Sequence, residues 1–203
     1  MQTAMPRAVF IDRDGVINRK AREGEYVTSW DDFYILPGVA EAVTLLKRAG
    51  YAVIVVTNQR CVAKGLLAVG ELENMHKRMR ESLSHLGAIV DGVYYCPHDY
   101  ESSCSCRKPA PGMLYEAARE HGLDLRSSWM VGDSEIDIQA GKNAGCKTAR
   151  VLSTDEKNPA VSKDTENTSR AEITASSLLD SVHQILKWDT GQEMNLEKRT
   201  LTA

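Results

Sequence analysis

Short apolar runs alternate along this chain with longer amphipathic stretches, and this alternation constrains the fold more than any other feature. The run Ala52–Thr57 is almost wholly apolar, which is typical of strands in a parallel sheet that is covered on both faces. The stretch Val69–Leu86, which follows it, carries Leu and Met at helical spacing. Strands connected by helices form right-handed βαβ units, so the sequence predicts an α/β fold with a doubly wound parallel sheet.

The predicted elements cover most of the chain. Six strands are expected, at Ala8–Asp12, Ala52–Thr57, Gly92–Cys96, Ser128–Gly132, Lys147–Val151 and Ala171–Thr174. Helices are expected at Pro37–Arg48, Val69–Leu86, Pro111–His121, Glu135–Ala144 and Ser177–Trp188. The polar stretch Ser153–Ser169 is predicted to be a loop. Residues 1–188 are thus expected to form one domain, and the polar, unpatterned residues 189–203 a disordered tail.

Composition narrows the class of protein. The chain of 203 residues is long enough to bury a core, and its formal net charge of −3 argues against a nucleic-acid-binding protein. No apolar run approaches the length of a membrane span, and the N-terminus lacks the layout of a signal peptide. Five cysteines, three of them clustered, fit a reducing compartment and a metal site better than a disulfide framework. We therefore expect a soluble, cytoplasmic monomer with a small-molecule substrate and no membrane or nucleic-acid partner.

Two carboxylates follow the first predicted strand. Side chains alternate along a strand, so Asp12 and Asp14 are expected on one side and Arg13 on the other. Such a pair at the carboxyl end of a parallel strand faces the crevice where ligands bind. Two close like charges need a cation between them or a retained proton. Mg²⁺ with one attacking carboxylate and one proton-donating carboxyl suits phosphate-ester chemistry, and Asp14 should then have a pKa nearer the working pH than Asp12. The alternative is a strand that ends in a solvated turn.

Other strand ends carry compatible groups. Thr57 and Asn58 supply a hydroxyl and an amide that can donate to phosphate oxygens. Lys108 precedes a predicted helix N-terminus, where a full charge and free N–H groups together attract anions. Asp133 is placed to complete a Mg²⁺ site with Asp12. Taken singly, each of these residues has a capping or surface role as an equal alternative, but such roles do not explain all four strand ends together.

A second metal site is predicted in the segment 96–106. Three thiols and one imidazole lie within eleven residues as Cys-x-His followed by Cys-x-Cys, which is a closed tetrahedral set for Zn²⁺. Four protein ligands leave no open position, so this zinc is expected to be structural. The alternative is a cluster of reduced surface thiols. The predicted ligands are Cys96, His98, Cys104 and Cys106.

Together these motifs resemble the haloacid dehalogenase superfamily of phosphotransferases over Val9–Val151. The resemblance implies a Rossmann-like core with Asp12 as the nucleophile, Asp14 as the acid and base, and Thr57 and Lys108 holding the phosphoryl group. It also implies that Mg²⁺ is bound by Asp12, by the backbone carbonyl of Asp14 and by Asp133, with Asp137 as a supporting acid. Too few residues separate the motifs for a lid domain, so a capless protein is expected in which the loops Arg19–Ser29 and Cys96–Arg107 shape the pocket.

Within the superfamily, the motifs are most similar to the D-glycero-D-manno-heptose 1,7-bisphosphate 7-phosphatase group, whose close relative is histidinol-phosphate phosphatase. This resemblance implies hydrolysis of a sugar phosphate in carbohydrate metabolism, substrate recognition by Arg107, and contact of the Glu23–Tyr26 segment with the sugar. Two departures are Val16, where the family has threonine, and Arg60-Cys61, where it has Ser-Gly. The predicted substrate-binding residues are Asn58, Gln59, Arg60, Arg107, Glu23, Tyr26 and Ser134.

Three rival functions remain open at this point. Histidinol-phosphate hydrolysis is the nearest. Removal of 3′-phosphate from DNA ends would be accompanied by a basic track, which the sequence does not have. A zinc-stapled binding module without turnover would be expected to lack an acid at position 12, 14 or 133, and all three acids are present.

Overall fold

The computed structural model describes residues 5–152 and 170–200 and, beyond Gly191, the helical backbone alone. The loop predicted at 153–169 and the last three residues of the predicted tail lie outside these described residues. Every pairing between the six described strands is parallel, and the sheet has the order β3-β2-β1-β4-β5-β6. The strands are β1 (Ala8–Ile11), β2 (Ala52–Asn58), β3 (Gly92–Cys96), β4 (Trp129–Gly132), β5 (Lys147–Val151) and β6 (Ile173–Ala175). The predicted doubly wound α/β fold is confirmed.

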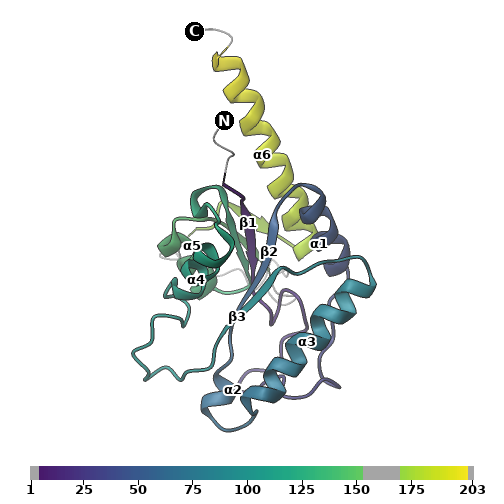
Figure 1. The fold of residues 1–203 in the computed structure, drawn as a ribbon, viewed down its shortest axis with the longest axis vertical. Coiled ribbons are helices and arrows are strands. Elements are labelled where there is room, and N and C mark those ends of the chain that lie inside the picture. The colour runs from purple at the N-terminus through teal and green to yellow at the C-terminus, as the bar shows by residue number, and fades with distance from the viewer. Residues whose placement is uncertain (1–4, 153–169, 201–203) are drawn as a thin grey trace, which may run out of the picture.

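Helices cover both faces of this sheet. They are α1 (Val39–Arg48), α2 (Arg60–Ala63), α3 (Val69–His85), α4 (Gly112–His121), α5 (Glu135–Ala144) and α6 (Leu178–Thr200), with a 3₁₀ turn η1 at Leu125–Ser127. Helices α1, α3 and α6 bury their apolar sides against one face, and α4 and α5 cover the other (Figure 1). Glycines in the left-handed conformation, Gly122 and Gly145, end α4 and α5.

Alternate side chains of β1 belong to two hydrophobic cores, one on each face of the sheet. Val9 and Ile11 belong to the larger cluster under α1, α3 and α6, whereas Ala8 and Phe10 belong to the smaller cluster under α4 and α5. All four side chains are fully buried. A strand between two helical layers must be apolar at every position, and this is why the run reads as continuously hydrophobic.

Three features differ from the sequence prediction. Helix α2 and the turn η1 were not predicted, because four and three residues are too few to show a period. Helix α6 continues to Thr200, beyond its predicted end at Trp188 and into the segment for which disorder was expected. Asp189 itself is buried, and its carboxylate accepts hydrogen bonds from Arg7 at 3.0 Å and Lys147 at 3.1 Å. The partners of Asp189 are distant in the chain, so the sequence around Asp189 does not indicate these contacts.

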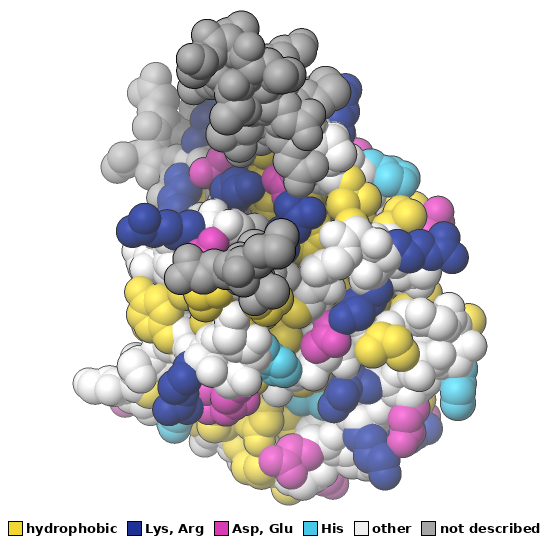
Figure 2. Space-filling model, turned by 45° about the horizontal axis from the view of Figure 1, so that its top comes forward, with side chains coloured by type: hydrophobic (Ala, Val, Ile, Leu, Met, Phe, Trp, Pro, Cys, Tyr) yellow, Lys and Arg dark blue, Asp and Glu magenta, His cyan; other side chains and the backbone are white. Residues whose placement is uncertain are grey.

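The surface carries both signs of charge. On the face in Figure 2, Lys and Arg side chains are interspersed with Asp and Glu side chains and with apolar ones. None of the described helices has the length and apolar character needed to cross a bilayer. In the described chain, the segments between the strands contain only loops and the helices named above, so the core is capless as expected.

Candidate active site

The site lies where three adjacent parallel strands end. Strand β1 is central and pairs with β2 on one side and β4 on the other, so the residues that follow these strands meet at one edge. Asp12 directly follows β1, and its N–H still donates to the carbonyl of Val131 at 2.9 Å. Thr57 belongs to the end of β2, and Asp133 follows β4. The structure therefore brings together three of the four groups that the sequence singled out.

Lys108 connects two carboxylates in the interior of this site. Its Nζ lies 2.6 Å from Oδ1 of Asp12 and 2.6 Å from Oδ1 of Asp137, and it donates to the carbonyl of Val56 at 2.9 Å. Asn58 fixes the backbone of Lys108 through two reciprocal hydrogen bonds of 3.1 Å. Burial alone would lower the pKa of Lys108, but the two carboxylates outweigh it and raise that pKa. Lys108 is therefore a permanent buried cation.

The acidic cluster has the composition of a divalent cation site. Carboxylate oxygens of Asp12, Asp133 and Asp137 all lie within 4.8 Å of one another. Lys20 Nζ contacts Oδ2 of Asp133 at 2.7 Å, so with Lys108 two ammonium groups face three carboxyl groups. Burial raises the pKa of Asp12 to about 7, Lys108 opposes this, and the other acids reinforce it. A set of oxygen ligands in which carboxyl groups outnumber ammonium groups fits Mg²⁺.

Two glycines make this clustering possible. Gly132 has no Cβ, and one placed there would overlap the Cβ of Asp137. Gly15 has a φ of +96°, and a Cβ there would overlap the carboxylate of Asp133. A side chain at either position would displace an acid from the cluster, which is why glycine follows the Asp-x-Asp pair and precedes Asp133.

Asp14 is held by a separate set of donors. Arg13 Nη2 donates to both carboxylate oxygens, at 2.9 and 2.8 Å, and Asn18 Nδ2 donates to Oδ1 at 2.9 Å. Gln59 Nε2 lies 2.8 Å from Oδ2 of Asp14 and 2.8 Å from the hydroxyl of Thr57. Gln59 therefore links the predicted acid and base to the predicted phosphate-holding threonine.

Two expectations about this motif are wrong. Strand β1 ends at Ile11, before the Asp-x-Asp pair, and residues 13–18 form a tight turn, so Arg13 folds back onto Asp14 instead of facing the opposite side. Burial raises the pKa of Asp14, but Arg13 and the hydrogen bonds from Asn18, Arg13 and Gln59 together lower it below its ordinary value. In the arrangement seen here it is Asp12, and not Asp14, whose pKa lies near neutrality.

A cluster of cationic and aromatic side chains lies beside the segment 96–106, which carries the predicted zinc ligands. Arg60 Nε contacts Oδ1 of Asp99 at 2.5 Å, which connects α2 to this loop. The guanidinium carbons of Arg60 and Arg107 each lie 4.2 Å from the ring centroid of Tyr100. Arg107 also donates to the carbonyl of His98 at 3.1 Å. Two guanidinium groups are thus held near one another by one exposed ring.

The remaining predicted substrate-binding residues lie around these groups. The hydroxyl of Ser134 donates to the Asp137 carboxylate. Tyr26 is partly buried, and Nζ of Lys64 lies 5.3 Å from its ring centroid. Glu23 is exposed in the same loop. Because the amides of Asn58 and Gln59 are engaged with Lys108 and Asp14, substrate contact by these residues stays a prediction.

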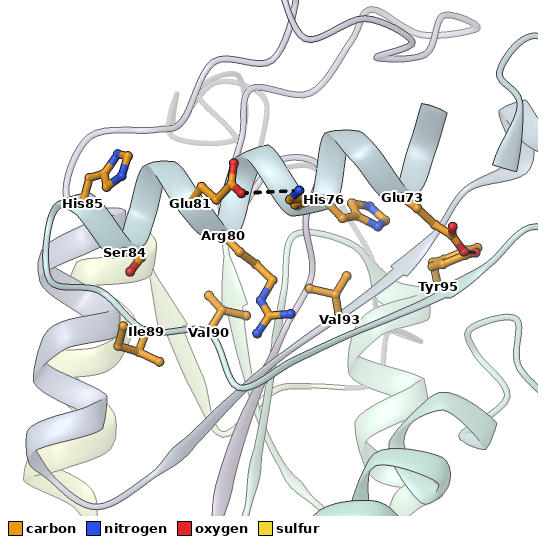
Figure 3. Close-up of a pocket in the computed structure, with 11 residues that line it drawn as sticks. Glu73, His76, Arg80, Glu81, Ser84, His85, Ile89, Val90, Val93 and Tyr95 are labelled. Carbon is orange, nitrogen blue, oxygen red and sulfur yellow. Dashed lines mark hydrogen bonds and ion pairs between the residues drawn. The ribbon is translucent and has the colours of Figure 1, made fainter. Parts of the chain in front are cut away.

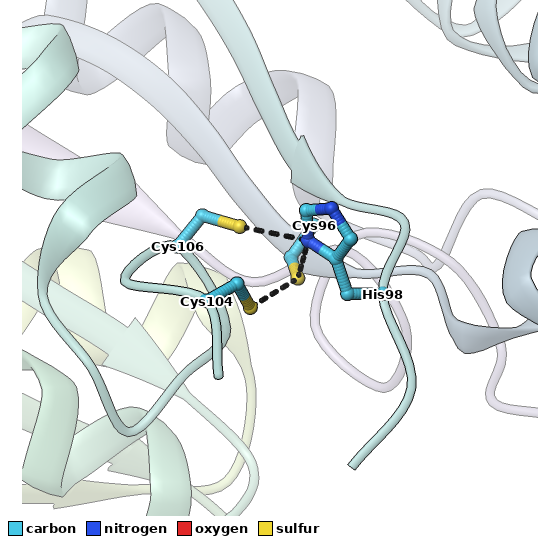
Figure 4. Close-up of side chains that lie close together, drawn as sticks. All are labelled: Cys96, His98, Cys104 and Cys106. Atoms are coloured by element: carbon cyan, nitrogen blue, oxygen red, sulfur yellow. Dashed lines mark hydrogen bonds between the residues drawn. The ribbon is translucent and has the colours of Figure 1, made fainter. Parts of the chain in front are cut away.

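The three thiols and the imidazole of the second motif converge at the end of β3 (Figure 4). Sγ of Cys96 lies 3.5 Å from Nδ1 of His98 and 3.7 Å from Sγ of Cys104. Nδ1 of His98 lies 3.2 Å from Sγ of Cys106. A tetrahedral Zn²⁺ with bonds of about 2.3 Å to sulfur separates two sulfur ligands by about 3.8 Å, so the spacing fits this ion.

Sequence reasoning missed several residues of the site. Lys20, Asn18 and His76 come from a loop, a turn and the distant helix α3, and each contacts a group of the site or its support. Asn18 could have been found from the sequence, because it lies three residues after Gly15 in the turn that follows the Asp-x-Asp pair. Lys20 and His76 had none, because nothing in the chain around them indicates what they contact.

The chain is similar to known phosphatases over most of its length. A family model described as HAD-hydrolase-like matches residues 105–181. The D-glycero-β-D-manno-heptose-1,7-bisphosphate 7-phosphatase of Photorhabdus laumondii is 42% identical over 154 residues, which cover 72% of this chain and 80% of that protein. The Pseudomonas aeruginosa enzyme of the same name is 40% identical, over 72% of this chain and 82% of that protein.

A solved structure gives the same result. The crystal structure of D,D-heptose 1,7-bisphosphate phosphatase from Bordetella bronchiseptica, complexed with magnesium and phosphate, superposes with a TM-score of 0.76. The two chains are 34% identical, and the match covers 89% of this chain and 98% of the other.

Proposed function

Because this chain belongs to the HAD-like hydrolases, and within them to the family of the D-glycero-β-D-manno-heptose-1,7-bisphosphate 7-phosphatases, we propose that it removes the 7-phosphate of a heptose 1,7-bisphosphate. The reaction class is phosphoric monoester hydrolysis. The observation that carries the proposal is the set of Asp12, Lys108 and the acidic cluster at adjoining strand ends.

The chain's own residues account for both halves of such a reaction. An oxygen of Asp12 attacks phosphorus, the phosphorus–oxygen bond to the sugar breaks, and Asp14 as the acid gives its proton to the leaving oxygen. In the second half, Asp14 accepts a proton from water as that water attacks the phosphoaspartate, which frees Asp12 and phosphate. Lys108 offsets charge on the transferring group. Mg²⁺, held by Asp12, Asp133 and the backbone carbonyl of Asp14 and supported by Asp137, would supply further charge neutralisation.

Asp14 needs its proton only while the sugar oxygen departs. Four donated hydrogen bonds favour its carboxylate in the free protein, which is the form that accepts a proton from water. A phosphate dianion beside Asp14 would add negative charge and raise its pKa. The arrangement described here thus corresponds to the form that acts as the base.

The second metal of the proposal is a structural Zn²⁺ on Cys96, His98, Cys104 and Cys106. Its support is the fit of the interatomic distances among these four side chains. Arg107 and Lys108 follow the last ligand directly, so such a zinc would fix the direction in which both cations point. A zinc site of this kind needs its three cysteines as thiolates, and the proposal therefore includes a reducing, cytoplasmic location.

The phosphate that is not hydrolysed needs its own anion site. The guanidinium groups of Arg60 and Arg107, together with Lys64 near Tyr26, supply positive charge beside the loops around the active site. This charge favours a bisphosphate over a monophosphate with a cationic tail such as histidinol phosphate. Arg60 and Arg107 are accordingly proposed to recognise the distal phosphate, and Tyr26 and Glu23 to contact the sugar.

Steady-state kinetics with Mg²⁺ would test the proposal. We expect kcat/KM for D-glycero-β-D-manno-heptose 1,7-bisphosphate to exceed that for its α-anomer, for histidinol phosphate and for fructose 1,6-bisphosphate. Asp12→Asn, purified in parallel, controls for contaminating phosphatases. A preference for histidinol phosphate would replace the proposed substrate. No turnover of any ester would favour a zinc-stapled binding module.

A further inference from the structure

We propose that His76 is a positioning residue, which acts through Arg13 to hold the Asp14 carboxylate in its reactive place. The inference rests on the phosphomonoester hydrolysis proposed above and does not depend on which sugar is the substrate. His76 belongs to α3, a helix to which the mechanism assigns no group, and it lies 63 positions from Arg13 in the chain.

Arg13 is the connection between the two. Its side chain is buried, with Nη2 on both oxygens of Asp14 and Nη1 3.1 Å from Nε2 of His76. Nη1 also lies 3.9 Å from the sulfur of Met75, and the guanidinium lies 5.5 Å from the ring centroid of Phe33. One face of the cation is thus packed, one edge holds the acid, and the other edge is anchored by the imidazole.

The direction of the hydrogen bond follows from the donors. A guanidinium only donates, so Nε2 of His76 accepts and the ring is neutral with its proton on Nδ1. Burial, and then the adjacent Arg13, lower the pKa of His76 to about 3, which agrees with a neutral ring. A neutral imidazole accepts a hydrogen bond from Arg13 but does not neutralise the guanidinium, so the positive charge of Arg13 still acts on Asp14.

The anchor is needed because Arg13 and Asp14 are neighbours in sequence. A flexible side chain can meet the carboxylate of the next residue in many conformations, and only an outside contact selects one. Nε of Arg13 has no hydrogen-bond partner among the described residues, so the interaction with His76 is what fixes the second edge of the guanidinium. Losing it would leave Asp14 with the hydrogen bonds from Asn18 and Gln59 but without a fixed Arg13 guanidinium on its two oxygens.

His76 is buried, but its side chain borders a cavity. It is one of the residues that line an open cavity of about 550 Å³ between α3 and the segment Ile89–Tyr95 (Figure 3). A small probe can therefore enter next to the ring's position, which permits chemical rescue of a truncated side chain.

Two variants separate positioning from folding. His76→Leu removes the acceptor at similar volume, whereas His76→Gln keeps a carbonyl oxygen that can accept from Nη1. Since kcat/KM reports steps up to the first phosphoryl transfer, it depends on Asp14 as an acid only for an alkyl leaving group. We expect His76→Leu to lower kcat/KM about 10- to 100-fold for the sugar phosphate that the wild-type protein hydrolyses best, which is the heptose bisphosphate under the function proposed above. For 4-nitrophenyl phosphate, whose phenolate leaves without a proton, kcat/KM should stay within about threefold of wild type.

His76→Gln should recover most of the loss, and added imidazole should restore activity to His76→Ala in a saturable manner. His85→Leu, an exposed histidine of the same helix and cavity, is the matched control and should behave as wild type. Equal losses on both esters, or no loss on either, would overturn the positioning role. Absence of turnover in wild type would instead count against the proposed function.

Discussion

Nζ of Lys108 lies 2.6 Å from Oδ1 of Asp12, although 96 positions separate the two residues in the chain. The same ammonium group contacts Asp137, so one buried cation holds the first and last acids of the motif set in place. Asn58 in turn holds the Lys108 backbone, so Lys108 connects the ends of β1 and β2 with helix α5. Such pre-arranged charge is what stabilises a phosphoryl group as it is transferred.

The first prediction concerns the nucleophile. Asp12→Asn keeps the side-chain volume but removes the attacking oxygen and a metal ligand. We expect kcat to fall about a thousandfold or more while the circular dichroism spectrum is unchanged. A variant that retains activity within about tenfold of wild type would contradict the assignment of Asp12.

The second prediction concerns the close approach at Gly132. A methyl group in Gly132→Ala must displace Asp137, which would loosen Lys108 and lower kcat about 10- to 100-fold. Gly70→Ala is the matched control, because a Cβ at this α3 position meets no atom within 4 Å. Equal activity of the two variants would show that Asp137 does not need its observed position.

The third prediction concerns the second metal. Protein purified under reducing conditions should contain one zinc per chain, measured by elemental analysis. Cys106→Ser should release that zinc and lower the free energy of unfolding by a few kcal/mol. Replacing the exposed neighbour Ser105 by Ala should leave the zinc content unchanged. Wild type without zinc would refute the metal assignment.

The fourth prediction concerns substrate recognition. Arg60→Ser should lower kcat/KM for the bisphosphate about tenfold or more and leave that for 4-nitrophenyl phosphate nearly unchanged, because only the former carries a distal anion. Asp99→Asn, which removes the partner of Arg60, tests whether the effect arises from a displaced loop. Parallel losses on both esters would place Arg60 in support of the reacting phosphoryl group.

The fifth prediction is a pH dependence of stability. The pKa of His76 is about 3 in the folded protein, below its ordinary value of 6.5. Between these values the unfolded chain binds more protons, so stability falls as pH decreases from about 6.5 toward 3. His76→Gln should remove about 2 kcal/mol of this loss at pH 5 relative to pH 7.5, as measured by urea unfolding. Identical pH profiles for the two proteins would mean that the imidazole is not buried in its neutral form.

The positions of strands and helices along the chain could be predicted from the sequence, because hydrophobic periodicity is a local property. Continuous apolar runs such as Val53–Val56 exist only where both faces of a strand are covered, and the period of Val69–His85 identifies a helix of one buried side. Asp12, Lys108 and Asp133 were found for the same reason. Asp12 and Asp133 lie at the ends of predicted strands, and Lys108 precedes a predicted helix. Parallel strands bring such positions to one edge of the sheet.

Only the tertiary structure decided what surrounds these residues. The return of Arg13 onto Asp14, the contact with His76 and the approach of Lys20 to Asp133 depend on side-chain directions and on loops that no period describes. The same holds for the low pKa of Asp14, because it is the balance of burial against donors from distant segments. Hydrophobic periodicity is a property of neighbouring residues, so the sequence determines it. The electrostatics of a buried site depend on which distant residues meet there, and only the tertiary structure decides that.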